Sequence, residues 1–254
     1  MPDAERAFEP RGRRVRAAVA TPRNGLCAMS RLELPPGVIY DVDCRACQRL
    51  AVFLDRVKAT NPSYFCRPVP PFGDPDAWLV IVGLAPGMHG ANATGRPFTG
   101  DYAGILLYQT LFDYGWATQP TSKSADDPLR LTGARLTNAV KCLPPDNKPM
   151  PAEAKRCNHY LANELRAMPQ AGAILALGHV AHDAVLRALD ARPSAYPFGH
   201  GAMHRIETRE KTLMLFDSYH CSRYNTNTNR LTPAMFRNVF DAVAEHLGRP
   251  RPPV

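Results

Sequence analysis

The sequence predicts an α/β fold with a mostly parallel sheet that is covered by helices on both faces. Apolar runs of strand length alternate with helical stretches, a pattern typical of parallel sheets. The apolar run at residues 78–82 is followed by a long connection at residues 83–101, rich in glycine and proline, and then by a helical stretch from Tyr102. Because ligands in open α/β sheets bind beyond the carboxyl ends of strands, this long connection is the first candidate for a functional site.

Four buried strands and five helical stretches account for most of the chain after residue 36. The strands are expected at short apolar runs, at residues 78–82, 135–140, 173–177 and 213–216. The helices are expected in the longer stretches around them, at residues 44–59, 102–111, 152–168, 180–189 and from Pro233 onward. Together they predict a single three-layer domain over residues 37–250.

Three segments are expected to lack regular structure. Residues 1–36 are rich in arginine and proline and are interpreted as a poorly ordered basic arm. Their apolar part is too short for a secretory signal, and their acidic residues argue against a transit peptide. Residues 61–75 hold five prolines, and residues 119–130 are polar, so both segments are expected to be irregular.

Composition limits the classes of function. A chain of 254 residues with 45% hydrophobic residues can form a packed core. Its net charge of +8 favours a polyanionic partner such as nucleic acid. No run of about 18 apolar residues is present, so neither a transmembrane helix nor a membrane partner is expected. Seven cysteines without a secretory signal predict reduced thiols in the cytoplasm rather than a disulfide framework.

Four cysteines form a candidate metal site. Cys44 and Cys47 have the spacing C-x2-C, and Cys142 and Cys157 are separated by 14 residues. Four thiolates suit zinc or an iron–sulfur cluster equally in ligand type. Zinc ribbons usually pair two short knuckles, and the second pair here is not one. The spacing therefore favours a cluster over zinc, with four unligated buried thiols as the third interpretation. Three cysteines remain, for which packing as small apolar side chains suffices: Cys27, Cys66 and Cys221.

Three sequence blocks follow or end the predicted strands. They are GLAPG at residues 83–87 with GRPFTGD at 95–101, NAVKCLPP at 138–145, and HCS at 220–222 with NRLT at 229–232. Together they resemble the uracil-DNA glycosylase superfamily, and within it the family 5 (type b) enzymes. The resemblance covers about residues 42–247 and implies one domain around a central parallel four-stranded sheet. It also implies a [4Fe–4S] cluster, with zinc as the weaker alternative, on Cys44, Cys47, Cys142 and Cys157.

The resemblance implies a DNA repair enzyme. Such an enzyme flips uracil out of double- or single-stranded DNA, hydrolyses its N-glycosidic bond and leaves an abasic site. Other deaminated bases, such as hypoxanthine, are further candidate substrates. A monomer in a bacterial or archaeal cytoplasm, near the nucleoid during repair, is expected.

Five residues are expected to bind the flipped nucleotide. Phe98 can stack on a pyrimidine. The Asn138 amide can donate to uracil O4 and accept from N3–H, a pattern that cytosine reverses. A core phenylalanine and an asparagine in a strand-end turn are the alternative interpretations. Three residues of the first block complete the set: Gly83, Ala85 and Asp101. Asp101 is explained equally well as the N-terminal cap of the following helix.

Three further polar residues are candidates for the chemical step. His220 follows the fourth strand and is expected to donate a hydrogen bond to uracil O2 as negative charge develops on the departing base. A loop histidine without a function is the alternative. His89 and Asn92 are expected to position the attacking water or to hold the deoxyribose.

A basic loop after His220 is expected to contact DNA. Arg223 and Arg230 are suited to phosphate contacts, and Tyr224 is a candidate wedge in the base stack. Lys141, after the second strand, is expected to add a phosphate contact. A solvated polar turn is the alternative for the whole loop.

Two positions depart from the superfamily pattern. Cys221 stands where the third block usually has proline, which leaves the rigidity of that loop open. Ala85 stands where other branches carry a carboxylate or asparagine. This alanine fits family 5, and it leaves open which residue activates water.

Two other classes of function agree with parts of the sequence. One is a non-catalytic nucleic-acid-binding protein with a structural four-cysteine metal site. The other is a small-molecule phosphate or nucleotide enzyme that uses the glycine-rich connection. The absence of G-x-x-x-x-G-K-[ST] and G-x-G-x-x-G weakens the second class.

Overall fold

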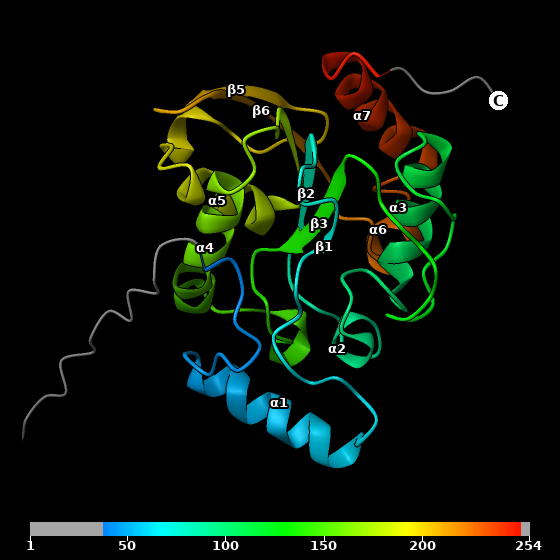
Figure 1. Ribbon diagram of the computed structural model, residues 1–254, viewed down its shortest axis with the longest axis vertical. Helices are drawn as coiled ribbons and strands as arrows, with labels where there is room; N and C mark the ends of the chain where they lie inside the picture. The colour runs from blue at the N-terminus through cyan, green and yellow to red at the C-terminus, as the bar shows by residue number, and fades with distance from the viewer. Residues whose placement is uncertain (1–37, 250–254) are drawn as a thin grey trace, which may run out of the picture. The chain divides into compact units, whose positions relative to one another are not determined.

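The computed structural model describes residues 38–249, so the basic arm expected over residues 1–36 lies outside the described residues. Residues 38–249 form a central sheet with helices on both faces (Figure 1). This arrangement confirms the predicted three-layer α/β class. None of the helices in this part of the chain has the length and apolar character needed to cross a membrane.

The sheet has six strands in the order β1-β3-β2-β4-β6-β5. They are β1 (Phe72–Gly73), β2 (Leu79–Gly83), β3 (Ala134–Asn138), β4 (Ala173–Leu177), β5 (Met203–Glu207) and β6 (Thr212–Ser218). The four central strands run parallel, as predicted, and each edge strand pairs antiparallel with its neighbour. The edge strands were not predicted because β1 has only two residues and β5 buries one side chain of five, so neither has a continuous apolar run.

Helices cover both faces of the sheet. The helices of residues 38–249 are α1 (Gln48–Thr60), α2 (Ala91–Thr94), α3 (Tyr102–Asp113), α4 (Pro151–Arg166), α5 (His179–Ala188), α6 (Arg223–Asn227) and α7 (Pro233–His246), with two 3-10 turns, η1 (Pro145–Asn147) and η2 (Pro193–Ala195). Figure 1 shows α4 and α5 on one side of the sheet and α3 and α7 on the other. The predicted helices are therefore present, with ends that differ by a few residues.

Alternate side chains of β2 belong to two separate cores. Leu79 and Ile81 pack in the core that includes residues of α3 and α7. Val80 and Val82 pack in the core that includes residues of α4 and α5. Because the strand is buried on both faces, its sequence is continuously apolar instead of alternating.

A buried carboxylate joins β3 to α4. Glu164 accepts hydrogen bonds from Arg135 Nε at 2.7 Å and from Thr137 Oγ1 at 2.8 Å. Lys141 Nζ lies 3.3 Å from the same carboxylate and also donates to Thr137 Oγ1. Lys141 is only 2% exposed, so its ammonium group cannot reach a phosphate. The prediction that Lys141 contacts DNA is therefore wrong.

Replacing Glu164 tests this network. Glu164→Gln should lower the free energy of unfolding by about 3–5 kcal/mol, because two cations would remain with no balancing charge. Urea unfolding measures the difference. The matched control is Asp55→Asn, since the Arg45–Asp55 pair is 59% exposed on both sides and should leave the midpoint unchanged. Equal losses in the two variants would contradict a special role for the buried pair.

Candidate active site

A cavity of about 360 Å³ opens at the carboxyl ends of the parallel strands. The segment after β2, the start of α3, the end of β3, η1 and the turn after β6 all contribute to its wall. The lining residues are Leu84, Ala85, Gly87, Ala91, Phe98, Asp101, Tyr102, Ala103, Asn138, Asn147, His220, Ser222 and Arg223. The structure thus brings Phe98, Asn138 and His220 together, as their places after three strands predict. The volume is typical of a small-molecule site.

Gly83, Asn138 and Phe98 form a narrow slot in this cavity. Gly83 and Asn138 are register partners on β2 and β3. A Cβ atom on Gly83 would lie 2.5 Å from Asn138 Oδ1 and 2.6 Å from Phe98 Cζ, so only glycine allows this approach. Among residues 38–249 no partner hydrogen-bonds the Asn138 amide, which leaves its donor and its acceptor free for a ligand.

Phe98 is held in a backbone conformation that favours glycine. Its φ is +57°, which has an energetic cost for a bulky residue. Two contacts with the loop after α3 support this turn. Thr99 Oγ1 lies 2.7 Å from Ser122 Oγ, and the buried Arg96 guanidinium donates to the Asp127 carboxylate. The loop at residues 119–130 therefore anchors the aromatic side of the slot.

His220 lies on the turn after β6. Its ring is nearly parallel to that of Phe98, at 28° with centroids 6.3 Å apart. Asn225 Nδ2 donates to the His220 carbonyl at 2.8 Å, which fixes the backbone. Burial lowers the pKa of His220 to about 4. The ring is therefore neutral at physiological pH and can still donate one N–H.

Asp101 directs its carboxylate away from the helix that it precedes. It occupies the N-terminal cap position of α3 but makes no side-chain capping bond. Instead Oδ2 accepts from the Ala91 amide at 3.1 Å, and a Cβ on Gly90 would collide with the carboxylate. The capping interpretation is therefore wrong. Burial raises the pKa of Asp101, against the Ala91 hydrogen bond and the nearby His89, which lower it.

The four predicted metal ligands meet in a second cavity, between α1, α4 and the turn after β3. The cysteines that line it are Cys44, Cys47, Cys142 and Cys157, and all four are free thiols. Burial and the charges of neighbouring thiols raise the pKa of Cys142, and burial raises the pKa of Cys157 to about 11. No three of these four sulfur atoms lie within 4.8 Å of one another.

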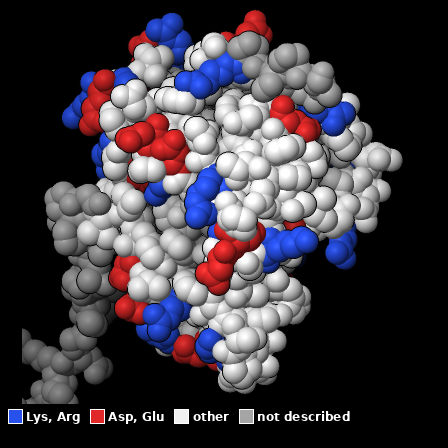
Figure 2. Space-filling view, turned by 45° about the vertical axis from the view of Figure 1, so that its right-hand side comes forward, with Lys and Arg blue, Asp and Glu red and all other residues white. Residues whose placement is uncertain are grey.

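Three residues predicted to contact DNA are exposed beside the cavity. Tyr224 is 71% exposed. The Arg223 guanidinium lies 5.1 Å from the centre of the Tyr102 ring, and that of Arg230 lies 4.6 Å from the centre of the Tyr219 ring. On the face seen in Figure 2, basic and acidic side chains form small separate groups among uncharged residues. Any positively charged contact on this face is therefore local.

Comparison with known proteins identifies the family. The model of the uracil DNA glycosylase superfamily matches residues 70–244. The chain belongs to this superfamily.

Relatives named type-5 uracil-DNA glycosylases match most of the chain. The Thermus thermophilus protein is 45% identical over 201 residues, which cover 77% of this chain and 90% of the relative. The Pyrobaculum aerophilum protein is 38% identical over 229 residues, or 87% of this chain and 98% of the relative. The Mycobacterium bovis protein is 42% identical over 206 residues, which cover 78% of this chain and 75% of the relative. The resemblance seen in the three sequence blocks is confirmed.

Two residues expected to act in this glycosylase fold lie outside the cavity lining. Asn92 is completely buried, and its Nδ2 lies 3.5 Å from both Cys66 Sγ and the Met88 carbonyl. His89 is exposed, with Nδ1 2.8 Å from the Tyr64 hydroxyl. Their contacts hold the glycine-rich connection against the segment after α1. The catalytic roles predicted for Asn92 and His89 are therefore not supported by their positions.

Two polar residues that line the glycosylase cavity lie outside the sequence blocks and were not predicted. Tyr102 begins α3, directly after Asp101. Asn147 lies on η1 with a φ of +54°. Each stands within two residues of a sequence block, but neither block indicates which neighbouring side chain reaches the cavity.

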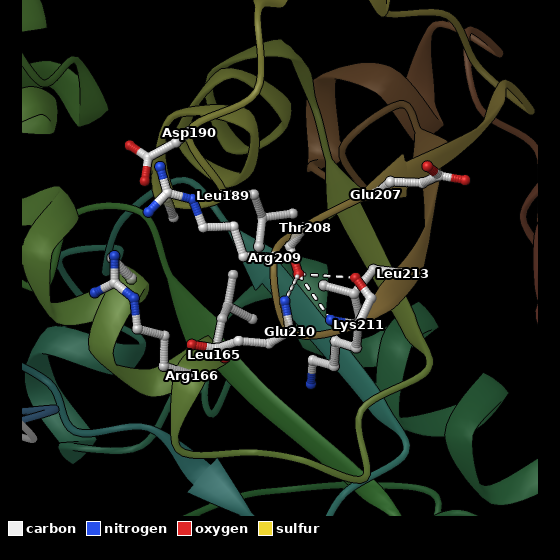
Figure 3. Close-up of a pocket in the computed structure, with 12 residues that line it drawn as sticks. Leu165, Arg166, Leu189, Asp190, Glu207, Thr208, Arg209, Glu210, Lys211 and Leu213 are labelled. Atoms are coloured by element: carbon white, nitrogen blue, oxygen red, sulfur yellow. Dashed lines mark hydrogen bonds between the residues drawn. The ribbon is translucent and has the colours of Figure 1, made fainter.

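A larger cavity, of about 570 Å³, lies at the opposite edge of the sheet. Figure 3 shows it between the ends of α4 and α5 and the turn that joins β5 to β6, with Leu165, Leu189 and Leu213 among its lining residues. The turn is closed by hydrogen bonds between Thr208 and Lys211. No residue from the carboxyl end of a parallel strand lines this cavity, so its size does not make it the glycosylase site.

Filling the slot tests whether it receives the base. Gly83→Ala should slow the release of uracil from DNA, the reaction after which the family is named, by about 10²-fold, because a displacement of about 1 Å can have that effect. The control is Gly172→Ala, whose Cβ would lie at an ordinary 3.5 Å from Leu247 Cδ2. Single-turnover assays with both variants make the comparison. A wild-type rate in Gly83→Ala would place the base elsewhere.

Proposed function

We propose that this chain removes uracil from DNA by hydrolysing the N-glycosidic bond. One observation carries the proposal: a single cavity joins an aromatic ring, a free amide, a half-buried carboxylate and a neutral imidazole. These four groups match the tasks of stacking a flipped base, recognising its edge, activating water and stabilising the leaving group.

Base recognition rests on Phe98 and Asn138. The ring of Phe98 offers a face for stacking, and stacking of this kind contributes about 1–3 kcal/mol per base. The Asn138 amide donates to uracil O4 and accepts the N3–H hydrogen. Cytosine presents a donor and an acceptor in the reverse places, so it leaves both groups of a buried amide unpaired. The slot left by Gly83 admits only a flat ring.

The chemical step depends on two residues of the cavity, Asp101 and His220. Asp101 accepts a proton from water as the water oxygen bonds to C1′. The C1′–N1 bond breaks, and its electron pair leaves with uracil. Negative charge on the uracil oxygens is stabilised by the N–H of neutral His220, which keeps its proton. Ala85 lines the cavity without a polar group, so Asp101 supplies the base that this position lacks.

Two variants test the division of roles. His220→Ala should lower the single-turnover rate by about 10²–10³-fold, and Asp101→Asn by about 10²–10⁴-fold. Affinity for uracil-free DNA should change little in either variant. The assay is incubation of excess enzyme with uracil-containing duplex and single-stranded DNA, followed by alkaline cleavage at abasic sites.

The pH dependence follows from the same two groups. Asp101 acts when ionised, so the rate should fall as the pH drops through its raised pKa. His220 remains neutral until the pH approaches about 4 and contributes nothing to this loss. Asp101→Asn should remove the part of the acid limb that is due to Asp101, and His220→Ala should keep it. A wild-type rate in Asp101→Asn would remove Asp101 from the mechanism.

The surface around the cavity suits DNA. Arg223 and Arg230 are placed to neutralise phosphates, and exposed Tyr224 is placed to fill the stack that a flipped nucleotide leaves. All of these residues come from one chain, so a monomer suffices. The free thiols of the described residues suit a reducing cytoplasm.

The four cysteines fit a [4Fe–4S] cluster better than a zinc ion. Thiolates around one zinc at about 2.3 Å lie roughly 3.8 Å apart, whereas here no three sulfurs lie within 4.8 Å of one another. In a [4Fe–4S] cluster each cysteine binds a different iron atom, so the four cysteine sulfurs lie farther apart than around one zinc ion. Thiols with raised pKa values need a cationic centre to stay deprotonated. When bound, such a cluster would tie α1 to α4 and to the turn after β3.

Iron content tests this assignment. Cys44→Ser should lower bound iron, weaken the broad visible absorption and lower the melting temperature. Cys221→Ser is the matched control, because Cys221 is a buried free thiol outside this cavity and should retain iron. Iron and zinc are measured in the purified proteins. Zinc in place of iron in the wild-type protein would favour the zinc alternative.

A further inference from the structure

The strand that precedes His220, β6, ends among three histidines. Asp217 and Ser218 complete β6 and are fully buried, and Tyr219 and His220 follow. His182 approaches this strand end from α5, His204 from β5 and His200 from the loop before β5. None of the three lines the proposed active-site cavity.

His200 contacts the residue directly before His220. Its Nδ1 lies 3.2 Å from the Tyr219 amide nitrogen, and its ring stacks on that of Tyr219 at 21°, with centroids 5.0 Å apart. An amide N–H can only donate, so Nδ1 must accept and carries no hydrogen. The His200 ring is therefore neutral, with its hydrogen on Nε2. Burial lowers its pKa, against a hydrogen bond with the Met235 backbone, and so favours the neutral form.

His182 has the opposite protonation state. Its Nδ1 lies 2.8 Å from Asp217 Oδ1, and its Nε2 lies 2.8 Å from the Tyr196 carbonyl. Both neighbours are acceptors, so beside an ionised Asp217 both ring nitrogens carry hydrogen. Burial alone would lower the pKa of His182, but the Asp217 hydrogen bond and charge raise it. With both ring nitrogens hydrogen-bonded, His182 forms an ion pair with Asp217, and His204 Nε2 lies 3.5 Å from the other carboxylate oxygen.

We propose that His200 is a positioning residue for base excision: its neutral Nδ1 holds the Tyr219 amide and thereby sets the place of the His220 ring, on a strand end fixed by the His182–Asp217 ion pair. The proposal rests on the role proposed for His220. The backbone around His220 is then held from both sides, since Asn225 Nδ2 binds its carbonyl at 2.8 Å. Protonation of His200 removes the acceptor and releases one of these two contacts.

The charged surroundings make this contact sensitive to acid. His200 faces Tyr219, whose ring also lies near Arg230, and no described carboxylate is paired with it. Ser218 Oγ, 3.4 Å from Nδ1, is uncharged, so a proton on His200 would gain no opposite charge. His182 faces Asp217 and His204 from the sheet and His179 and Asp183 from α5, so Asp217 balances its charge.

Asparagine and glutamine at position 200 separate the two hydrogen bonds of the ring. Asparagine places an oxygen near the position of Nδ1 and cannot be protonated, whereas glutamine reaches the position of Nε2. His200→Asn should excise uracil in single turnover within about threefold of the wild-type rate, and His200→Gln at least about tenfold more slowly. Both variants should melt like the wild type and bind uracil-free duplex DNA equally well.

A pH series adds a readout that a merely structural role would not move. The excision rates of the wild type and of His200→Asn both fall at low pH because Asp101 becomes protonated. The ratio of the His200→Asn rate to the wild-type rate removes this shared effect. This ratio should rise as the pH falls through the pKa of His200. Equal rates for the asparagine and glutamine variants, or a ratio that does not change with pH, would overturn the proposal.

Two controls keep the outcome interpretable. If the variants fold poorly, nitrogen-15 NMR of the wild-type imidazoles decides directly: a neutral His200 with its hydrogen on Nε2 supports the proposal, and a hydrogen on Nδ1 overturns it. His220→Ala separates the two hypotheses. If that variant is slow while both His200 variants match the wild type, only the positioning role fails. If His220→Ala is as fast as the wild type, the proposed role of His220 fails as well.

Discussion

The close approach of backbone segments at a few glycines determines the shape of the active site. A Cβ at Gly83 would fill the space between Asn138 and Phe98, and one at Gly90 would collide with the Asp101 carboxylate. A Cβ at Gly104, in α3, would collide with the Phe98 carbonyl oxygen. Three of the four groups proposed to act on the base are thus placed by contacts that only glycine permits. The hydrogen bonds of the site can form only because these glycines let the backbone segments approach so closely.

The order of apolar runs was sufficient to predict the cavity, because the ends of parallel strands meet at one edge of a sheet. Phe98, Asn138 and His220 were correctly placed together for that reason. Side-chain directions within a long connection are not set in this way. Asp101 and Asn92 belong to the same connection, yet the carboxylate reaches the cavity and the amide is buried near Met88. Residue type alone does not separate these two outcomes.

Lys141 illustrates a second limit of the sequence. A lysine after a strand is normally exposed, and its burial depends on a partner brought by another element. Here α4 packs against the sheet and places Glu164 next to β3, where its carboxylate pairs with both Lys141 and Arg135. The edge strands were missed for a related reason, since their pairing depends on neighbours and not on their own apolar pattern. Tertiary context decided both cases.

Burial shifts the pKa values of His220 and Asp101, the two proposed catalytic groups, in directions that suit their proposed roles. It lowers the pKa of His220 and raises that of Asp101, because a medium of low polarity favours the neutral form of each. A neutral imidazole can donate to a developing anion without losing its proton, and a less stabilised carboxylate is a stronger base. Both effects grow when water is excluded. Since Tyr224 and Arg223 stand exposed beside the cavity, DNA bound across them would exclude water from it. In the proposed mechanism, the substrate is thus part of the environment that shifts the pKa values of His220 and Asp101.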